Sequence, residues 1–332
     1  MNERISFETI LHGLSDAKDT LVLFHRSPDA DAVGSAYAMK KILEALGSRA
    51  YCVCESEIPA RLSFLLFGEQ ESVLPESIPD DFCVGRIVSV DTASPFQLGR
   101  LNALFGDRVD LMIDHHGKGE AYARLVYVRP DAAATGEIML DLFKLLAEQK
   151  SLSMTRELAM ALYAAISSDT GGFRFSNTRP ETHLRAAELL SCGIDAAGIN
   201  HLLFESKSVE QLRAEAAGAS ALSLHGEGRV AIISFPYALK AELGLEDAHL
   251  ETLIDVARSV SGAQLAFVIR QPSLEGVFRV SARSVCDFDV SALCASFGGG
   301  GHVKAAGCTV FAADITAARQ TILDAIDFSL LN

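Results

Sequence analysis

The first half of the chain alternates short apolar segments of strand character with longer segments of helical periodicity. Residues 20–26 (TLVLFHR) precede a helical pattern over residues 32–47, and strand-like segments recur at residues 49–54, 85–91, 109–116 and 123–128. Alternation of this kind is typical of parallel βαβ units with right-handed crossovers. We therefore expect an α/β fold built on an open parallel sheet.

A chain of 332 residues is longer than a domain with a single hydrophobic core usually is, so its length favours two domains. We expect a parallel-sheet domain over residues 1–194, a helical linker over residues 195–225, and a smaller α/β domain over residues 226–332. In the last of these, strands are predicted from the segments RVAIISF, QLAFVIRQ and GVFRVSARSV. The linker could serve as a homodimer surface or only as a spacer.

Composition limits the partners of the protein. The formal net charge of −14 disfavours extended contact with long nucleic acid, while a small phosphorylated ligand stays possible where a metal reverses the local field. The seven cysteines are scattered among apolar residues, which is typical of reduced thiols in the cytosol. No secretory signal or membrane span is recognised, so a cytoplasmic location is expected.

Residues 24–35 (FHRSPDADAVGS) hold His25, Asp29 and Asp31 directly after the first apolar segment. An imidazole and two carboxylates on a turn at the end of a strand can reach a shared point, as a divalent transition metal with N and O ligands requires. The pair Gly34-Ser35 is expected to open the following helix, whose free N–H groups favour anions. The alternative is an ordinary Asp-rich turn with a helix cap.

Two later strand-like segments also end in acids. Asp91 closes RIVSVD, where the following Thr and Ser equally suit a plain strand end with a helix cap. The segment LMIDHHG delivers Asp114, His115 and His116. A lone His is usually structural, but this run supplies one metal ligand, a second imidazole for substrate or acid chemistry, and a carboxylate that orients them.

A fourth acid ends a helical pattern in AISSDTGGFRF. An isolated carboxylate such as Asp169 is disfavoured at a helix C-terminus, where the dipole is already negative, and a nearby cation would resolve this. Together the motifs offer enough N and O ligands for two metals about 3.5 to 4 Å apart, a common device for activating water at a phosphoryl group. The candidate ligands are His25, Asp29, Asp31, Asp91, His115 and Asp169.

The C-terminal part contains a candidate anion site. Four consecutive glycines from Gly298 to Gly301 let backbone N–H groups approach an anion, while Arg283 and His302 offer charge-assisted hydrogen bonds to phosphate. The alternative is a flexible surface loop.

The motifs HRSPDADAVGS, VDT, DHH and SDTGGFRF, followed by FGGGGHVKAAG, resemble in order those of the DHH phosphoesterase superfamily with its DHHA1 domain. The resemblance covers nearly the whole chain and is nearest to the nanoRNase and pAp-phosphatase branch. It implies two manganese ions, with magnesium possible, and the bridging carboxylate of Asp91. It assigns His25, Asp29 and Asp91 to one ion, and Asp31, Asp91, His115 and Asp169 to the other.

The resemblance also assigns roles around the metals. His116 would contact the scissile phosphate and Asp114 would orient the histidines. Because the DHHA1 domain of the family binds the part of the substrate away from the cleaved bond, substrate binding is expected at Arg283, Ser284, Gly300, Gly301 and His302.

The implied enzyme is a hydrolase that converts di- to pentaribonucleotides to nucleoside 5′-monophosphates, or pAp to AMP and phosphate. A cyclic or linear dinucleotide phosphodiesterase of the same superfamily is the nearest alternative, and a non-catalytic nucleotide sensor is a second one. RecJ-like exonucleases and family II pyrophosphatases fit the length and the C-terminal motif less well. The sequence leaves open the substrate preference, the cleavage polarity, the metal used in the cell and the oligomeric state.

Overall fold

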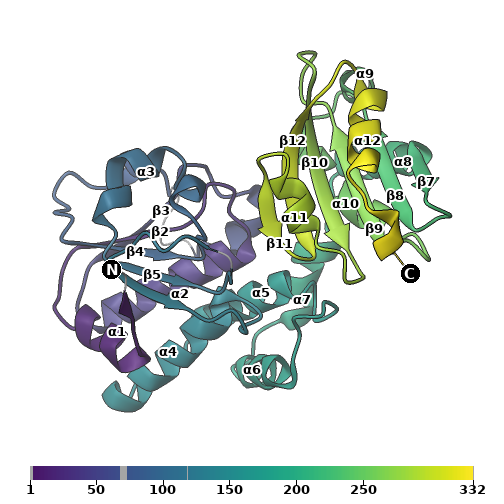
Figure 1. The fold of residues 1–332 in the computed structure, drawn as a ribbon. Coiled ribbons are helices and arrows are strands. Elements are labelled where there is room, and N and C mark those ends of the chain that lie inside the picture. Colours follow the sequence, from purple (N-terminus) through teal and green to yellow (C-terminus); the bar gives the residue numbers. More distant parts are fainter. Residues whose placement is uncertain (1–2, 68–72, 118, 332) are drawn as a thin grey trace. The chain divides into compact units, whose positions relative to one another are not determined.

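The computed structural model describes residues 3–67, 73–117 and 119–331. The chain divides into two compact units, Met1–Ser206 and Lys207–Asn332, which run from purple to teal and from green to yellow in Figure 1. The expected linker over residues 195–225 contributes α7 (Ala196–Asn200) to the first unit, and α8 (Val209–Ser220) and β7 (Leu222–His225) to the second. Leu222–His225 is thus a strand where helical periodicity was expected.

The first unit is built on a parallel sheet with the strand order β1-β6-β5-β4-β2-β3. This confirms the predicted parallel α/β fold. Because β2 pairs with β3 on one side and with β4 on the other, the strand order reverses there, and the carboxyl ends of β2 and β4 flank the position where open α/β sheets bind ligands. The strands are β1 (Glu3–Arg4), β2 (Thr20–Leu23), β3 (Ala50–Val53), β4 (Arg86–Val90), β5 (Leu111–Asp114) and β6 (Leu125–Val128).

Helices cover both faces of this sheet, because consecutive strand residues face opposite sides. Val22, Val88 and Ile113 pack against α1, α2, α4 and α5, while Leu21 and Met112 pack against α3 on the other face. The helices are α1 (Phe7–Leu14), α2 (Ala30–Ala45), α3 (Arg100–Phe105), α4 (Thr135–Lys150), α5 (Arg156–Asp169) and α6 (Pro180–Leu190). The unit is completed by the short 3-10 helices η1 (Ala60–Leu65), η2 (Pro75–Ser77), η3 (Pro95–Leu98) and η4 (Gly106–Arg108) and by the π-helical turn η5 (His201–Glu205).

Helix α2 lies unusually close to α5 at Gly34. A Cβ at this position would overlap the backbone carbonyl oxygen of Ala161 and lie 3.2 Å from the Cβ of Ala165. Gly34 and Ser35 were expected to open the helix, and this was wrong: α2 begins at Ala30, so both residues lie inside it. The glycine is needed for the approach of the two helices, which brings the start of α2 near the end of α5.

The second unit contains a mixed sheet with the order β11-β12-β10-β9-β8-β7, in which only β8 and β9 run parallel. Its helices cover one face through α11 and α12 and the other through α8 and α10. The strands besides β7 are β8 (Val230–Phe235), β9 (Leu265–Arg270), β10 (Val277–Ser284), β11 (Gly300–His302) and β12 (Ala305–Phe311). The helices besides α8 are α9 (Tyr237–Glu242), α10 (Leu253–Arg258), α11 (Val290–Ala295) and α12 (Ile315–Asp324), with turns η6 (Asp247–Leu250) and η7 (Phe328–Leu330).

None of the helices within the described ranges combines the length and the apolar character that crossing a bilayer requires.

Candidate active site

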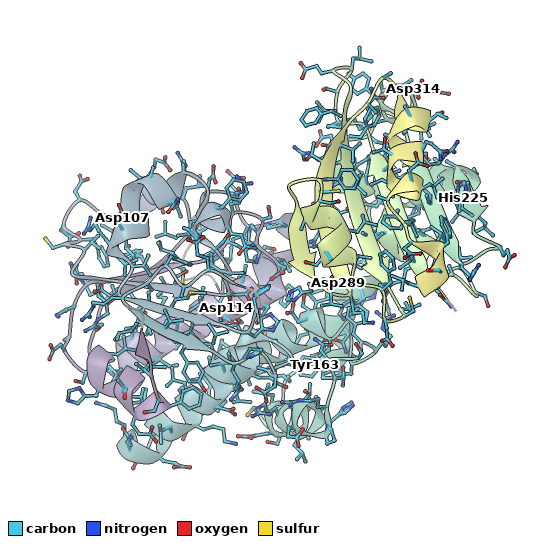
Figure 2. All side chains as sticks on the ribbon, in the orientation of Figure 1. Asp107, Asp114, Tyr163, His225, Asp289 and Asp314 are labelled. Carbon is cyan, nitrogen blue, oxygen red and sulfur yellow. The ribbon has the colours of Figure 1, made fainter. Side chains whose placement is uncertain are left out.

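The carboxyl edge of the parallel sheet collects the polar residues that the first unit's motifs supply. His25 follows β2, Asp91 follows β4, and β5 ends at Asp114, directly before His115 and His116. Because parallel strands end at the same edge, residues far apart in sequence are brought together there. Asp114 is labelled in Figure 2 among the side chains that crowd this edge.

Asp91 lies at the centre of this group. One of its oxygens, Oδ2, is 3.5 Å from Nε2 of His25, and Oδ1 is 3.8 Å from Nε2 of His115 and 3.9 Å from Nδ1 of His116. Its backbone has φ of 51°, a left-handed conformation that non-glycine residues adopt rarely. Strain of this kind clusters at functional positions, where the surrounding structure maintains it.

The start of helix α2 contributes two carboxylates. Asp29 is the N-cap, and its Oδ1 accepts a hydrogen bond from the backbone N–H of Ala32 at 3.0 Å. The same oxygen lies 3.7 Å from Nε2 of His25. Asp31 occupies the first turn and is fully buried. Its Oδ2 lies 3.9 Å from Nε2 of His115.

The N-terminus of helix α4 holds the buried Asp31 in place. Backbone N–H groups of Thr135 and Gly136 donate to its two oxygens at 2.7 and 2.8 Å, and the hydroxyl of Ser35 donates at 3.0 Å. The hydroxyl of Thr135 also donates to Oδ1 of Asp91 at 3.0 Å. Sequence reasoning missed Thr135 and Gly136; the only signal was a Thr-Gly pair shortly after the strand-like segment at residues 123–128.

Asp169 is the last residue of helix α5, as predicted. Its Oδ2 lies 3.2 Å from Nε2 of His115, and 22 % of its side chain is exposed. The other ring nitrogen of His115, Nδ1, donates to the carbonyl oxygen of Ala132 at 3.3 Å. This bond leaves Nε2 directed at the carboxylates, which is the usual arrangement for a histidine that ligates a metal.

Asp114 connects the two histidines of the DHH run. Its Oδ1 accepts a hydrogen bond from Nδ1 of His116 at 2.7 Å and from the backbone N–H of His115 at 2.8 Å. Because a carboxylate oxygen accepts in such a bond, Nδ1 of His116 is the donor and carries a proton. Asp114 is fully buried, and its Oδ2 has no hydrogen-bond partner among the described residues.

The buried acids perturb one another strongly. Burial and the charge of Asp91 raise the pKa of the Asp31 carboxyl well above its usual range. Burial raises the pKa of Asp169 to about 6, although the hydrogen bond with His115 opposes this. Burial acts in the same direction on Asp91, but the hydrogen bond with His25 and the nearby imidazoles outweigh it and hold the Asp91 pKa below its usual range.

The imidazoles show the complementary effect. Burial alone would lower the pKa of His25, but its bonds with Asp29 and Asp91 raise it well above the usual value. In the same way Asp169 raises the pKa of His115 against the effect of burial. Excess negative charge in this buried group therefore demands either protons or cations.

This donor set fits divalent metal ions. In the described part of the chain, the acids at the centre pair with imidazoles and with no Lys or Arg. Carboxylate oxygens and imidazole nitrogens are ligands of Mn²⁺, Zn²⁺ and related ions. Three groups in the first unit have ligand atoms within 4.8 Å of one another, and Asp91 belongs to each of them. They are His25, Asp29 and Asp91; Asp31, Asp91 and His115; and Asp91, Asp114 and His116.

In the second unit, four of the five residues with a predicted role in substrate binding share a small region. Arg283 on β10 and His302 on β11 both pair with Ala305 of β12, so they lie in one row across three strands. Gly300 and Gly301 belong to the same exposed strand β11. Gly301 has φ of 141°, and a Cβ there would lie 2.7 Å from Cα of Ala306, so only glycine suits the position.

Ser284 differs from the other four. It follows Arg283 on an extended strand and therefore faces the opposite side of the sheet, where it is buried. Its hydroxyl donates to the carbonyl oxygen of Cys286 at 2.9 Å. Arg283 is half-buried, and this burial lowers the pKa of its guanidinium.

Two family profiles match the chain: the DHH family, N-terminal domain, over residues 19–166, and the DHHA1 domain over residues 230–327. The protein is a member of the DHH family. This confirms the family expected from the motifs, and with it the assignment of the chain to the hydrolases.

Two relatives are similar to this chain over most of its length. The bifunctional oligoribonuclease and PAP phosphatase NrnA of Thermus thermophilus is 33% identical over 91% of this chain and 87% of its own length. The cyclic-di-AMP phosphodiesterase GdpP of Geobacillus thermodenitrificans is 27% identical over 97% of this chain, but this match spans only 50% of GdpP.

A solved structure of an exopolyphosphatase-related protein from Bacteroides fragilis has the same fold. It superposes with a TM-score of 0.86 at 22% identity and covers 96% of this chain and 95% of its own. At this identity the likeness supports the DHH fold alone.

Proposed function

We propose that the protein is a metal-dependent phosphoesterase that hydrolyses di- to pentaribonucleotides to nucleoside 5′-monophosphates, or pAp to AMP and phosphate, or both. The observation that carries the proposal is the position of Asp91, a residue with a left-handed backbone whose carboxylate lies within 4 Å of the imidazoles of His25, His115 and His116. The NrnA relative of Thermus thermophilus, which matches this chain over most of both lengths, supports the choice of substrates.

In this proposal the acids and imidazoles hold two manganese ions, with magnesium as the other candidate. Asp91 is shared between the two ligand groups. Ions bound there would lower the pKa of a water molecule and neutralise the charge that develops on the phosphoryl group. His25, Asp29 and Asp91 serve one ion, and Asp31, Asp91, His115 and Asp169 serve the other.

The protein's own groups complete the chemistry. Asp114 holds Nδ1 of His116, so the opposite ring nitrogen, Nε2, is the one that would donate to an oxygen of the scissile phosphate. Burial lowers the pKa of His116, but the bond and charge of Asp114 outweigh it and raise the pKa, which favours the proton that such a donor needs. Thr135 and Gly136 fix the direction of the Asp91 and Asp31 carboxylates.

We further propose that the catalytic domain spans residues 1–194 and that the domain over residues 226–332 binds the substrate away from the cleaved bond. Arg283 and His302 would contact phosphate, and the small residues of β11 would let backbone N–H groups approach it. Ser284, whose hydroxyl is used within the protein, would support the Arg283 strand instead of contacting the ligand. The net charge of −14 favours short substrates over long ones.

The second candidate function is hydrolysis of cyclic or linear dinucleotides. It is favoured by the GdpP relative, which matches this chain over half of the GdpP length. The chemistry at phosphorus is the same, and only the shape of the substrate differs.

Product analysis tests the proposal. The purified protein with Mn²⁺ is incubated separately with pApA, a long single-stranded RNA, pAp and cyclic di-AMP, and the products are resolved by ion-exchange chromatography. Conversion of pApA to AMP with the long RNA largely spared is the expected result, while faster cleavage of cyclic di-AMP would favour the second candidate. If the protein leaves all four intact with Mn²⁺ or Mg²⁺, the catalytic proposal fails.

A further inference from the structure

An exposed aromatic side chain in the first unit carries a cation on one of its faces. Phe96, in η3, has 71% of its surface exposed, and the guanidinium carbon of Arg26 lies 4.6 Å from the centroid of its ring. Arg26 is itself exposed and forms no ion pair in the described part of the chain. A free cation against an open ring is notable in a protein with a net charge of −14.

Hydrogen bonds hold this pair in place. The backbone N–H of Arg26 donates to the carbonyl oxygen of Gln97 at 2.8 Å, and the side chain of Gln97 accepts from the N–H of Ala93 at 2.6 Å. Gly99 has φ of 60°, and a Cβ there would overlap the Glu55 carboxylate and lie 3.2 Å from Cδ of Arg26. The stem of Arg26 is therefore packed against Gly99 while its head group lies on Phe96.

The same two loops carry ligands of the candidate metal site. Arg26 follows His25 directly, and Phe96 lies five residues after Asp91 in the loop that leaves β4. Nε2 of His25 and Oδ2 of Asp91 are 3.5 Å apart, so the loops meet at the metal site as well as at the aromatic pair. The pair is thus part of the rim of the site where the phosphodiester would be cleaved.

We propose that Phe96 and Arg26 form a stacking platform for one nucleobase of the substrate, next to the scissile phosphate. This inference rests on the proposed function and adds to it the part of the substrate that the first unit recognises. One face of the Phe96 ring is covered by Arg26 and the other is left for a base. A base on an aromatic ring contributes about 1–3 kcal/mol without regard to its identity, and the nearby guanidinium adds attraction for the phosphate or the ring.

Such a platform would favour substrates that carry a nucleobase but would not discriminate between base sequences. Every base has a π-face, so the platform would accept purines and pyrimidines alike. A phosphodiester without bases, or with an abasic residue at the position that stacks, would gain nothing from Phe96.

Fluorescence tests the platform directly, because the chain contains no tryptophan. The variant Phe96→Trp introduces a single reporter at the platform, and Leu184→Trp on α6, where Leu184 is 70% exposed, is the matched control. Both are titrated with pApA and with ribose 5-phosphate in EDTA, which prevents turnover. We expect saturable quenching of the first variant by pApA only, and only absorbance effects in the control. Equal behaviour of the two variants would overturn the platform.

Kinetics give an independent test. With Mn²⁺, Phe96→Ala should lower kcat/KM for pApA by about 5- to 150-fold, the range that corresponds to the stacking of one base. Phe96→Tyr keeps the ring and should retain most of the activity. With dinucleotides that are abasic at the 5′ or the 3′ residue, one of the two should be cleaved equally by the wild type and Phe96→Ala, which identifies the stacked base.

The inference and the proposed function fail in different ways. If the wild type does not cleave pApA, the proposed function fails, while the fluorescence titration in EDTA still decides whether a base stacks on residue 96. If the wild type cleaves pApA and Phe96→Ala does so at the same kcat/KM, the function stands and the platform is wrong.

Discussion

Oδ1 of Asp114 accepts a hydrogen bond from Nδ1 of His116 at 2.7 Å, and both residues belong to the run of one acid and two histidines that ends strand β5. The bond fixes the tautomer and the direction of an imidazole that we assign to the scissile phosphate. Orientation of this kind is commonly worth about 10- to 100-fold in activity or metal affinity.

The variant Asp114→Asn should therefore lower kcat by about 10- to 100-fold while KM changes less, because a neutral amide supports the charged His116 poorly. Steady-state hydrolysis of pApA measures this. The matched control is Asp107→Asn, which removes an exposed acid that lies well away from Asp114 and should leave kcat unchanged (Figure 2). A wild-type kcat for Asp114→Asn would show that His116 needs no support from this carboxylate.

The shared position of Asp91 predicts a larger effect. Because Asp91 belongs to both proposed ligand groups, Asp91→Ala should abolish measurable turnover and weaken binding of both Mn²⁺ ions. Isothermal titration with Mn²⁺ after EDTA treatment and dialysis counts the ions: two for the wild type and fewer for the variant. An activity close to that of the wild type would remove the two-metal assignment.

Metal binding should also stabilise the fold. An ion at about 100 times its dissociation constant adds about 2.7 kcal/mol to the free energy of unfolding, which should raise the Tm by several degrees. Because several carboxylates lie close to Asp91, adding Mn²⁺ after EDTA treatment should raise the Tm of the wild type. Asp91→Ala should show little of this response in a calorimetric scan. An equal rise in both proteins would point to ions that bind elsewhere.

Much of the site was predictable because its residues lie at the ends of strands. The apolar runs before His25, Asp91 and Asp114 identify buried strands, and parallel strands end at one edge, so their convergence follows from the pattern. The helical pattern that ends at Asp169 likewise predicted a carboxylate at a helix C-terminus, where an acid is unexpected without a nearby cation.

The rest of the site depends on tertiary contacts that leave no local pattern. The sequence did not predict that the N–H groups of Thr135 and Gly136 would hold Asp31, since this requires α4 to begin beside α2. The position of Ser284 was predictable in principle, because it follows Arg283 on a strand and must face the other side. The strand β7 was missed because its residues continue the apolar spacing of the preceding helix α8.

Replacing glycine by alanine should have opposite effects on the free energy of unfolding at Gly34, where α2 closely approaches α5, and at Gly13, which has no such neighbour. Gly34→Ala places a Cβ against the carbonyl oxygen of Ala161, which is backbone and cannot move away freely, so we expect a loss of about 1–3 kcal/mol in the free energy of unfolding. Gly13→Ala, in the exposed part of α1 with nothing within 4 Å, should gain up to about 1 kcal/mol from helix propensity. Urea unfolding of both variants measures the difference. A gain at both positions would show that the helices have room to separate.

The ion pairs of Asp141, a residue outside the candidate metal site, predict how the free energy of unfolding depends on pH. Its carboxylate accepts from Arg129 at 2.7 Å and from Nε and Nη2 of Arg185 at 3.0 and 2.7 Å, and 21% of its side chain is exposed. Burial works to raise the pKa of Asp141, but the bonds from Arg185 and Arg129 outweigh it and lower the pKa below its usual value. A carboxyl with a lower pKa in the folded state stabilises the fold above its unfolded pKa of about 3.9, and this contribution disappears as the pH falls through the folded pKa.

Asp141→Asn should therefore cost about 2 kcal/mol at neutral pH, since two arginines that are each about four-fifths buried lose their charged partner. The difference between wild type and variant should stay constant down to about pH 5 and shrink below about pH 4. Urea unfolding across this range measures it, with Asp107→Asn, which removes an exposed carboxylate, as the matched control. If the cost of Asp141→Asn were the same in acid as at neutral pH, it would come from lost packing, and the ion pairs with Arg129 and Arg185 would contribute nothing to the pH dependence.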